Sequence, residues 1–392
     1  MAKLRVAFVA PSLDILGGQA VQADRLLRAW QADPDVDAWL VPVNTRLPAW
    51  LRFASRVKYL RTLVNELTYI PRLVKELARA DVVHIFSASY SSFLLAPFPA
   101  VVVSRLLGRP AVLNYRSGEG PDHLTRSRIA REVLARVDKN IVPSSFLVDV
   151  FRDFGIEATS IPNIVDLSTF RFRERNPLRP RLLSTRNFEG LYNVAATVRA
   201  FEIVQQRWPE ASLTLVGGGA DEPALRALVA QLGLRHVTFA GRVPPQAIAG
   251  FYADSDIYMQ TPSIDNMPTS VLEAFASGLP VVSTEAGGVP AIVAHGVTGL
   301  LAPIADYETV GRHVLRLLDQ PDYARGLAQA AYATCGSRTW PVVREQWLSA
   351  YHSVLPAAAR SATVDAVNAE RQEGSHSFTS MSAMPSAVER SR

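Results

Sequence analysis

The stretch Pro262–Gly288, PSIDNMPTSVLEAFASGLPVVSTEAGG, predicts a short helix followed by a buried strand. Pro268 suits the first position of that helix, because its missing N–H would be unpaired there in any case. Gly278 suits the C-terminal end, where a left-handed backbone is common. The free N–H groups and the dipole at the helix start favour an anion. Glu273 lies roughly 7–8 Å further along the axis at about 1.5 Å per residue, so the helix predicts a cradle for both the phosphate and the ribose of a nucleotide.

The acidic residues Asp265 and Glu273 also permit other interpretations. A hydrolase uses two carboxylates as acid and base, or as nucleophile, across one bond. Two acidic residues near the start and middle of a helix are also consistent with ordinary solvated side chains. The pair by itself leaves these alternatives open.

Bulk composition narrows the class of protein. A length of 392 residues favours two domains, and 48% hydrophobic with 20% charged residues is typical of a soluble globular protein. Cys335 is the only cysteine, which excludes a disulfide framework and a cysteine-based metal cluster and fits a reducing compartment. The apolar run near the N-terminus is typical of a first strand and too short for a signal peptide. A net charge of +5 favours anionic partners.

Short β-branched runs alternate with helical patterns, which predicts parallel sheets covered by helices on both faces. In the first half we expect strands at 4–10, 82–86, 111–114 and 140–142, with helices at 19–30 and 129–137. After the arginine-rich stretch RFRERNPLRPR, strands are expected at 181–185, 212–216, 237–239, 256–260 and 280–283. The predicted fold class is therefore α/β with two doubly wound domains, whose ligands lie at the carboxyl ends of the strands.

Several motifs follow one another along the chain: GGQAVQADRLL, IPNIVDLSTF, STRNFEGLYNV, LTLVGGG, Asp265-x7-Glu273, LPVVSTEAGGVPAIV and HGVTGLL. Together they resemble the retaining GT-B glycosyltransferases of the GT4 family. The usual family pattern is Glu-x7-Glu, a G-[LIVM]-P-V-V strand and a GG-x-P-E-[IL]-V turn. The resemblance covers most of the chain and implies two Rossmann-like domains that face each other across a central cleft.

The domain boundaries expected from the pattern and the resemblance are as follows. We expect an N-terminal acceptor domain over 1–162, a linker over 163–178 and a C-terminal nucleotide-sugar domain over 179–337. A final helix over 338–355 is expected to cross back to the N-terminal domain. The composition of 356–392, rich in Ala, Ser, Arg and Glu, predicts a disordered tail.

The resemblance assigns roles to the opening stretch. Glu273 aligns with the acid that grips the donor ribose, and Asp265 with the acid whose surroundings hold the transferred sugar. The backbone around the next four positions is expected to bind sugar hydroxyls and the distal phosphate; these are Asn266, Met267, Pro268 and Thr269. In this family the phosphate leaving group assists the acceptor, which attacks on the same face. The hydrolase interpretation is therefore disfavoured.

The resemblance also implies cations for the leaving diphosphate, and this chain departs from the usual set. Arg186 matches the family arginine, but the family lysine falls on Leu191 or Tyr192. Arg116 stands where a histidine is usual, and we expect it to be catalytic by supplying the lost cation. His123 is the alternative to Arg116 for the role of that histidine.

Glycine-rich loops are expected to complete the donor site. Gly17 and Gly18 follow the first strand and open a helix, where glycine lets the backbone approach a phosphate closely. Gly218 and Arg242 belong to loops that match the walls around the nucleobase and diphosphate in the family.

The function expected from the resemblance is retaining transfer of a hexosyl group to a glycan or lipid-linked acceptor. A UDP-sugar is favoured as donor and GDP-mannose comes next. No metal and no cofactor are expected, because arginine and helix dipoles take the cation's place. A catalytically impaired protein that binds sugar nucleotide or glycan is the alternative. Nucleic acid is not an expected partner, because the arginines are dispersed and lack interleaved aromatic residues.

The segment 47–77 mixes aromatic and aliphatic residues with Arg and Lys at helical spacing. Such a pattern is typical of a helix that lies on an anionic membrane surface. Two ordinary helices with a solvated basic face remain the alternative. A cytoplasmic protein, peripheral at the inner face of the plasma membrane, would fit the first interpretation.

Overall fold

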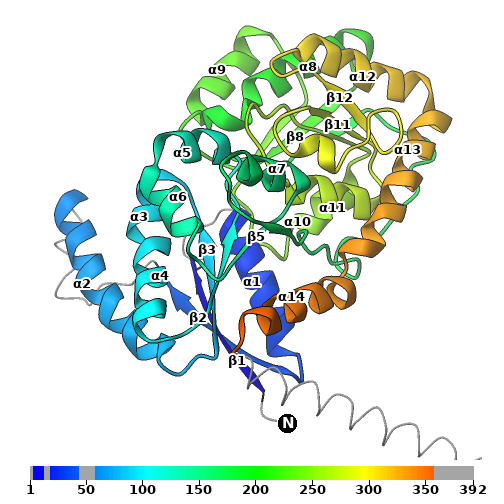
Figure 1. Cartoon of the computed structure of the whole chain (residues 1–392). Coiled ribbons are helices and arrows are strands. Elements are labelled where there is room, and N and C mark those ends of the chain that lie inside the picture. The colour runs from blue at the N-terminus through cyan, green and yellow to red at the C-terminus, as the bar shows by residue number, and fades with distance from the viewer. Residues whose placement is uncertain (1–2, 13–17, 44–57, 357–392) are drawn as a thin grey trace, which may run out of the picture.

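The computed structural model describes residues 3–12, 18–43 and 58–356, which form two parallel sheets flanked by helices (Figure 1). Each sheet has six strands. The predicted α/β fold class with two doubly wound sheets is confirmed.

The first sheet is built from the N-terminal half and has the strand order β2-β1-β3-β4-β5-β6. Its strands are β1 (Leu4–Ala10), β2 (Val36–Pro42), β3 (Val82–Ser87), β4 (Ala111–Tyr115), β5 (Lys139–Val142) and β6 (Thr159–Ser160). Its helices are α1 (Gly18–Gln31), α2 (Lys58–Leu77), α3 (Tyr90–Leu95), α4 (Pro97–Leu106), α5 (Gly120–Arg126), α6 (Arg128–Leu134) and α7 (Ser145–Asp153). Strands β3 and β4 are buried throughout, as expected for apolar runs covered on both faces.

The second sheet has the order β12-β11-β10-β7-β8-β9. Its strands are β7 (Arg181–Ser184), β8 (Ser212–Val216), β9 (Val237–Gly241), β10 (Ile257–Met259), β11 (Val281–Thr284) and β12 (Leu300–Ala302). The α-helices of this half are α8 (Val194–Arg207), α9 (Glu222–Gln231), α10 (Ile248–Asp254), α11 (Thr269–Ser277), α12 (Tyr307–Asp319), α13 (Pro321–Ala333) and α14 (Trp340–Val354). Short 3₁₀ turns are η2 (Gly190–Tyr192), η3 (Val289–Ala291) and η4 (Thr334–Arg338).

Sequence patterns did not predict three of these strands, namely β2, β6 and β12. All three lie at the edge of a sheet. An edge strand is paired on one side only, so its apolar run is shorter or interrupted by exposed residues, as in the alternating pattern of β2.

The arginine-rich segment between the sheets is anchored to the C-terminal half. Arg173 and Arg179 both form ion pairs of 2.7 Å with the fully buried Asp256, just before β10. Burial tends to raise the pKa of Asp256, but the hydrogen bonds from these arginines outweigh it and hold that pKa below its usual range. Arg175 is itself buried and donates to the carbonyl of Tyr252 at 2.9 Å. The arginines of this stretch therefore have a structural role.

Helix α14 packs on the first sheet, on the face that also carries α1 (Figure 1). Trp347 and Tyr351 join the apolar core of that face, and Tyr351 Oη lies 2.8 Å from His84 Nδ1. Arg344 donates to Asp33 at 2.5 Å. The C-terminal end of the described chain thus returns to the N-terminal half.

The predicted membrane-surface segment 47–77 is described only from residue 58, where α2 begins. Its first part, including residues 47–57, lies outside the described residues, as do Gly17 and residues 357–392. Among the helices of the described ranges, none is long and apolar enough to cross a bilayer.

Candidate active site

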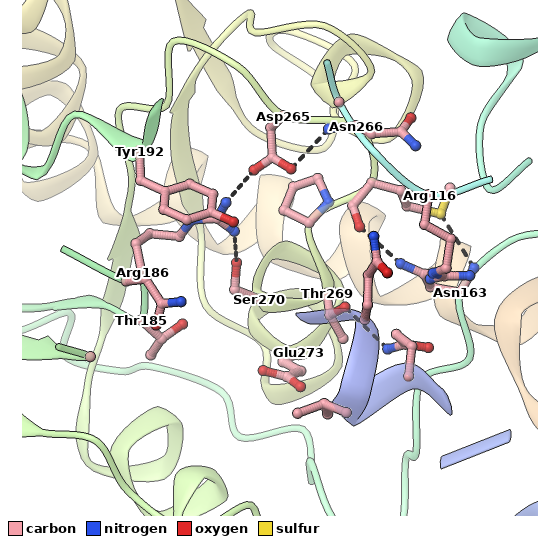
Figure 2. A pocket seen from close by; sticks show the side chains of 18 of the residues that line it. Arg116, Asn163, Thr185, Arg186, Tyr192, Asp265, Asn266, Thr269, Ser270 and Glu273 are labelled. Carbon is pink, nitrogen blue, oxygen red and sulfur yellow. Dashed lines mark hydrogen bonds and ion pairs between the residues drawn. The ribbon is translucent and has the colours of Figure 1, made fainter. Parts of the chain in front are cut away.

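A cleft of about 420 Å³ separates the two sheets and is lined from both halves of the chain (Figure 2). Its walls are helices α1 and α11 and the loops that follow β4, β7, β8 and β9. Parallel strands present their carboxyl ends at such an edge, which is where ligands bind in doubly wound folds.

Helix α11 begins one residue later than predicted. Pro268 is the N-cap, with φ −63° and ψ 116°, because its extended ψ places it just outside the helix that starts at Thr269. Gly278 ends the helix with φ 74°, as predicted. No side chain caps the helix start, and its first residues line the cleft. The N–H groups at this end are therefore available to an anion.

Arg186 and Asp265 form a buried ion pair at the cleft (Figure 2). Arg186 donates to Asp265 Oδ2 at 2.6 Å and to Ser270 Oγ at 3.2 Å. Asp265 Oδ1 accepts from the backbone N–H of Asn266 at 2.8 Å. Burial lowers the pKa of Arg186, but the Asp265 carboxylate outweighs it and holds that pKa above its usual value. Arg186 is therefore charged, and in the free protein the Asp265 carboxylate already balances its positive charge.

Tyr192 is one of the two positions on which the family lysine falls. Its ring lies under the guanidinium of Arg186, 4.0 Å from centroid to Cζ (Figure 2). Such a cation–π contact fixes the plane of the guanidinium but adds no positive charge. Leu191 also lines the cleft. Neither of the two positions on which the family lysine falls therefore supplies a second cation.

Glu273 is bound on both carboxylate oxygens. Arg25 of α1 donates to Oε1 at 2.5 Å, and Tyr252 donates to Oε2 at 2.9 Å. One turn away, Gln22 donates to Thr269 Oγ1 at 3.1 Å. The two α1 residues are three apart and their α11 partners four apart, so one face of each helix meets the other at two successive turns.

Sequence reasoning missed Gln22 and Arg25. The signal available was their spacing of three on the helix that follows the glycine pair, where two polar residues share one helical face. That spacing does not identify the partner, which is 248 positions away from Arg25.

Arg116 lines the cleft and has no carboxylate partner among the described residues. It donates to the side chain of Asn163, whose own amide donates to the Met267 carbonyl at 2.8 Å (Figure 2). Burial lowers the pKa of Arg116 to about 10, so the group is charged at neutral pH. A charged, unpaired guanidinium in a cleft is a site for an anion.

A series of hydrogen bonds between buried side chains connects Arg116 to helix α14. Asn114 accepts from Arg116 at 3.4 Å, and its amide lies 3.1 Å from His84 Nε2. His84 contacts Tyr351 of α14 through its other ring nitrogen. Burial, followed by the charge of Arg116, holds the pKa of His84 well below its usual value. The returning C-terminal helix therefore supports a cleft residue.

His123, the alternative to Arg116, is fully buried and does not line the cleft. Its Nδ1 lies 2.8 Å from Tyr115 Oη, and its ring packs against Phe93. Burial lowers its pKa. Arg116, and not His123, faces the cleft.

Gly218 is not among the described residues that line the cleft. Gly18 is the first residue of α1. Gly218 packs against Arg242, because a Cβ at Gly218 would lie 3.2 Å from Arg242 Cγ. Gly217 lines the cleft instead, and a Cβ there would lie 2.2 Å from the Arg186 carbonyl. Of the residues predicted to bind the donor, the cleft is also lined by Arg242, Asn266, Met267, Pro268 and Thr269.

Glycines also pack tightly around the Asp265–Asn266 loop. A Cβ at Gly287 would lie 2.1 Å from the Asp265 carbonyl, and one at Gly288 would lie 2.2 Å from that of Asn266. From the other half of the chain, a Cβ at Gly118 would lie 2.9 Å from the Asp265 carbonyl carbon. The double glycine of the opening stretch therefore allows close packing of the loop that carries Asp265.

Aspartates at a spacing of two occur in the sequence, and their carboxylates can in principle bind a hard cation. In the structure Asp33 and Asp35 pair with Arg344. Asp256 pairs with Arg173 and Arg179. Within the described ranges, no group of three or more His, Cys, Asp or Glu side chains is arranged to hold a metal.

Comparison with known proteins identifies the family. The profile of Glycosyl transferases group 1 matches residues 168–334, and that of Glycosyltransferase Family 4 matches residues 16–169. A sulfoquinovosyl transferase of Arabidopsis thaliana is 24% identical over 312 residues, covering 72% of this chain and 59% of that protein. A GDP-mannose-dependent alpha-mannosyltransferase of Mycolicibacterium smegmatis is 27% identical over 296 residues, covering 70% and 74%. The chain thus aligns with only about three fifths of the first relative's length.

Solved structures share the fold. Anabaena Alr3699/HepE in complex with UDP-glucose superposes with a TM-score of 0.72 at 18% identity, covering 89% of this chain and 100% of that one. Sucrose-phosphate synthase from Thermosynechococcus elongatus superposes with a TM-score of 0.68 at 19% identity, covering 89% and 98%. Two adjoining family profiles and two facing doubly wound sheets show that the chain belongs to glycosyltransferase family 4 and has the GT-B fold.

Proposed function

We propose that the protein is a retaining glycosyltransferase that moves a hexosyl group from a nucleotide sugar to a glycan or lipid-linked acceptor. A UDP-sugar is the favoured donor and GDP-mannose the next. One observation carries the proposal: the free start of α11, the Arg186–Asp265 pair and Glu273 line one cleft. The relative named for GDP-mannose and the structure solved with UDP-glucose support a nucleotide-sugar donor.

In the proposed complex the diphosphate lies between the start of α11, Arg186 and Arg116. Glu273 accepts hydrogen bonds from the ribose hydroxyls, and the loops of Gly218 and Arg242 enclose the base and diphosphate. The acceptor oxygen bonds to the anomeric carbon on the face from which the phosphate oxygen leaves. The acceptor proton passes to that phosphate oxygen as the carbon–phosphate-oxygen bond breaks. Fixed cations and the helix dipole stabilise the leaving charge, and no metal is required.

Asp265 has two functions in this proposal. It holds Arg186 in place through the 2.6 Å ion pair, and it accepts hydrogen bonds from the transferred sugar. Arg116 supplies the cation that the Leu191 and Tyr192 positions lack. When the diphosphate binds, it takes part of the Arg186 hydrogen bonding from Asp265, which leaves that carboxylate free to contact the sugar.

Thermal shift with a panel of sugar nucleotides tests the donor, because selective ligand binding raises the melting temperature. Cleavage of the selected donor is then measured with and without EDTA, and the anomer of the product is read by NMR. Arg116→Ala should reduce turnover far more than stability. Equal turnover in that variant would remove Arg116 from the chemistry, and an inverted anomer would reject the retaining mechanism.

A catalytically impaired sugar-nucleotide or glycan binder is the second candidate. The missing lysine and the compensation of Arg186 by Asp265 favour it. The same assays separate the two, because a binder is stabilised by sugar nucleotide without cleaving it, whether or not acceptor is supplied.

A further inference from the structure

The hydroxyl of Tyr252 contacts two residues of the cleft, although Tyr252 itself is not among the described residues that line it. Tyr252 is on α10 and is fully buried. Its Oη lies 2.9 Å from Glu273 Oε2 and 2.8 Å from Thr185 Oγ1. Thr185 directly precedes Arg186 in the chain. One buried hydroxyl therefore joins the carboxylate that the proposed function assigns to the ribose and the loop that carries a diphosphate cation.

The chemistry of the three groups sets the direction of these hydrogen bonds. A tyrosine hydroxyl carries one hydrogen, and a carboxylate can only accept. The Glu273 carboxylate is the stronger acceptor of the two, so Tyr252 donates to Glu273 and accepts from Thr185. Burial, followed by the charge of Glu273, raises the pKa of Tyr252 well above its usual value. The hydroxyl therefore keeps its hydrogen and remains a donor to Glu273.

Glu273 has partners from both halves of the chain, and they differ in how firmly they are held. Arg25 belongs to α1 of the N-terminal half and keeps 20% of its side chain exposed. Tyr252 belongs to α10, which packs against the α11 helix that carries Glu273. Its ring is fixed between Phe170 and Tyr258, with centroids 5.5 and 5.9 Å away. Ribose hydroxyls that compete for Glu273 therefore displace Arg25 and leave Tyr252 in place.

The hydrogen bond from Tyr252 also orients the Glu273 carboxylate. Oε2 is held by Tyr252, whereas Oε1 accepts from Arg25, which lines the cleft. Holding Oε2 thus keeps Oε1 directed into the cleft. Only 9% of the Glu273 side chain is exposed, and a buried charge without a hydrogen-bond partner is costly. Tyr252 supplies that partner after Arg25 has left.

We propose that Tyr252 is a positioning residue for donor recognition. It orients Glu273 toward the ribose hydroxyls and so makes the cleft selective for nucleoside diphosphates that carry both of these hydroxyls. The inference rests on the proposed function, because that function assigns Glu273 to the ribose. Tyr252 acts through Glu273 and does not touch the donor.

Isothermal titration with UDP, GDP and their 2′,3′-dideoxy forms tests the proposal. For each base, the Kd of the dideoxy form divided by the Kd of the ribose form measures selectivity for the hydroxyls. Wild type should prefer the ribose form. Tyr252→Phe should lower this selectivity about tenfold, the order expected for one hydrogen bond to a charged group. Its affinity for the dideoxy form should equal that of wild type, because that ligand offers Glu273 no hydroxyl.

Tyr258→Phe is the matched control. Tyr258 is also fully buried and packs against Tyr252, but its hydroxyl donates to Gln260 Oε1 at 3.3 Å and not to Glu273. This variant should keep the selectivity of wild type. Thr185→Val is a second test of the same series of hydrogen bonds. It should lower selectivity about threefold, because Tyr252 then lacks the group that donates to it.

Glu273→Gln separates failure of the inference from failure of the proposed function. If wild type prefers the ribose form, Glu273→Gln loses the preference and Tyr252→Phe retains it, the inference alone is overturned. Equal loss of selectivity in Tyr252→Phe and Tyr258→Phe would also overturn it, because any buried hydroxyl would then have the same effect. A wild type that binds neither ribose nucleotide, or binds both forms equally, refutes the assignment of Glu273 to the ribose and the inference with it.

Discussion

Removal of the Arg25 guanidinium should tighten nucleotide binding. In the free protein Arg25 binds the carboxylate of Glu273, which the proposed function assigns to the donor ribose. Ribose hydroxyls and Arg25 then compete for the same oxygen atoms. The ion pair joins α1 to α11, so it stabilises a closed cleft without ligand, and donor binding must break it.

The size of this gain in nucleotide affinity follows from how far the Arg25–Glu273 ion pair is exposed to water. Arg25 keeps 20% of its side chain exposed and Glu273 keeps 9%, so water still reaches the contact. Hydrogen bonds between charged groups contribute about 1.5–3 kcal/mol, which partial exposure reduces to about 1–2 kcal/mol. Since about 1.4 kcal/mol is tenfold in affinity, Arg25→Met should bind nucleotide about five- to thirty-fold more tightly.

Isothermal titration of UDP and of GDP measures this effect. Arg28→Met is the control, because Arg28 lies on the same helix and pairs with Asp24 at 2.8 Å outside the cleft. That variant should bind as wild type does. The ligand-free Arg25→Met protein should also melt at a lower temperature, because Glu273 loses one partner. Weaker nucleotide binding in Arg25→Met would refute competition and make Arg25 a donor-binding residue.

Three further perturbations test other parts of the structure. Arg186→Ala should lower the rate of donor cleavage by about 10²–10³, and an unchanged rate would exclude Arg186 from leaving-group stabilisation. Gly118→Ala places a Cβ 2.9 Å from the Asp265 carbonyl carbon, so it should force the two halves apart, reduce donor cleavage and lower the melting temperature, as loss of the Arg25–Glu273 pair does. Asp256→Asn should destabilise by about 2–3 kcal/mol at neutral pH, because it leaves two arginines unpaired. The pKa of Asp256 is lowered in the fold, so its stabilisation is present above the unfolded pKa of about 4 and is lost as pH falls below it. The difference in melting temperature between Asp256→Asn and wild type should therefore vanish in acid.

Several site residues were predictable because their signals are local. The start and end of α11 follow from Pro268 and Gly278, whose backbone preferences act at their own positions. Arg186 follows a recognisable strand, and Asp265 precedes a recognisable helix. Their pairing was not predicted, because it joins two segments that are 79 positions apart.

The positions of the missing lysine also show that the sequence locates a residue whereas the structure shows its contacts. Sequence position identified Leu191 and Tyr192 as the place of the loss, but only the structure shows the Tyr192 ring against Arg186. Likewise, Arg116 and His123 were both candidates for the histidine's role. His123 is buried among Tyr115 and Phe93, whereas Arg116 lines the cleft.

By itself, the sequence determined the alternation of strands and helices, the α/β class and the family resemblance, because periodicity and turn residues act over a few neighbouring positions. Tertiary structure alone decided which distant side chains meet: Arg25 with Glu273, Gln22 with Thr269, and α14 behind Arg116. The physical reason is that packing of whole elements, and not the pattern within any one of them, sets which faces are buried against each other and which are left to solvent.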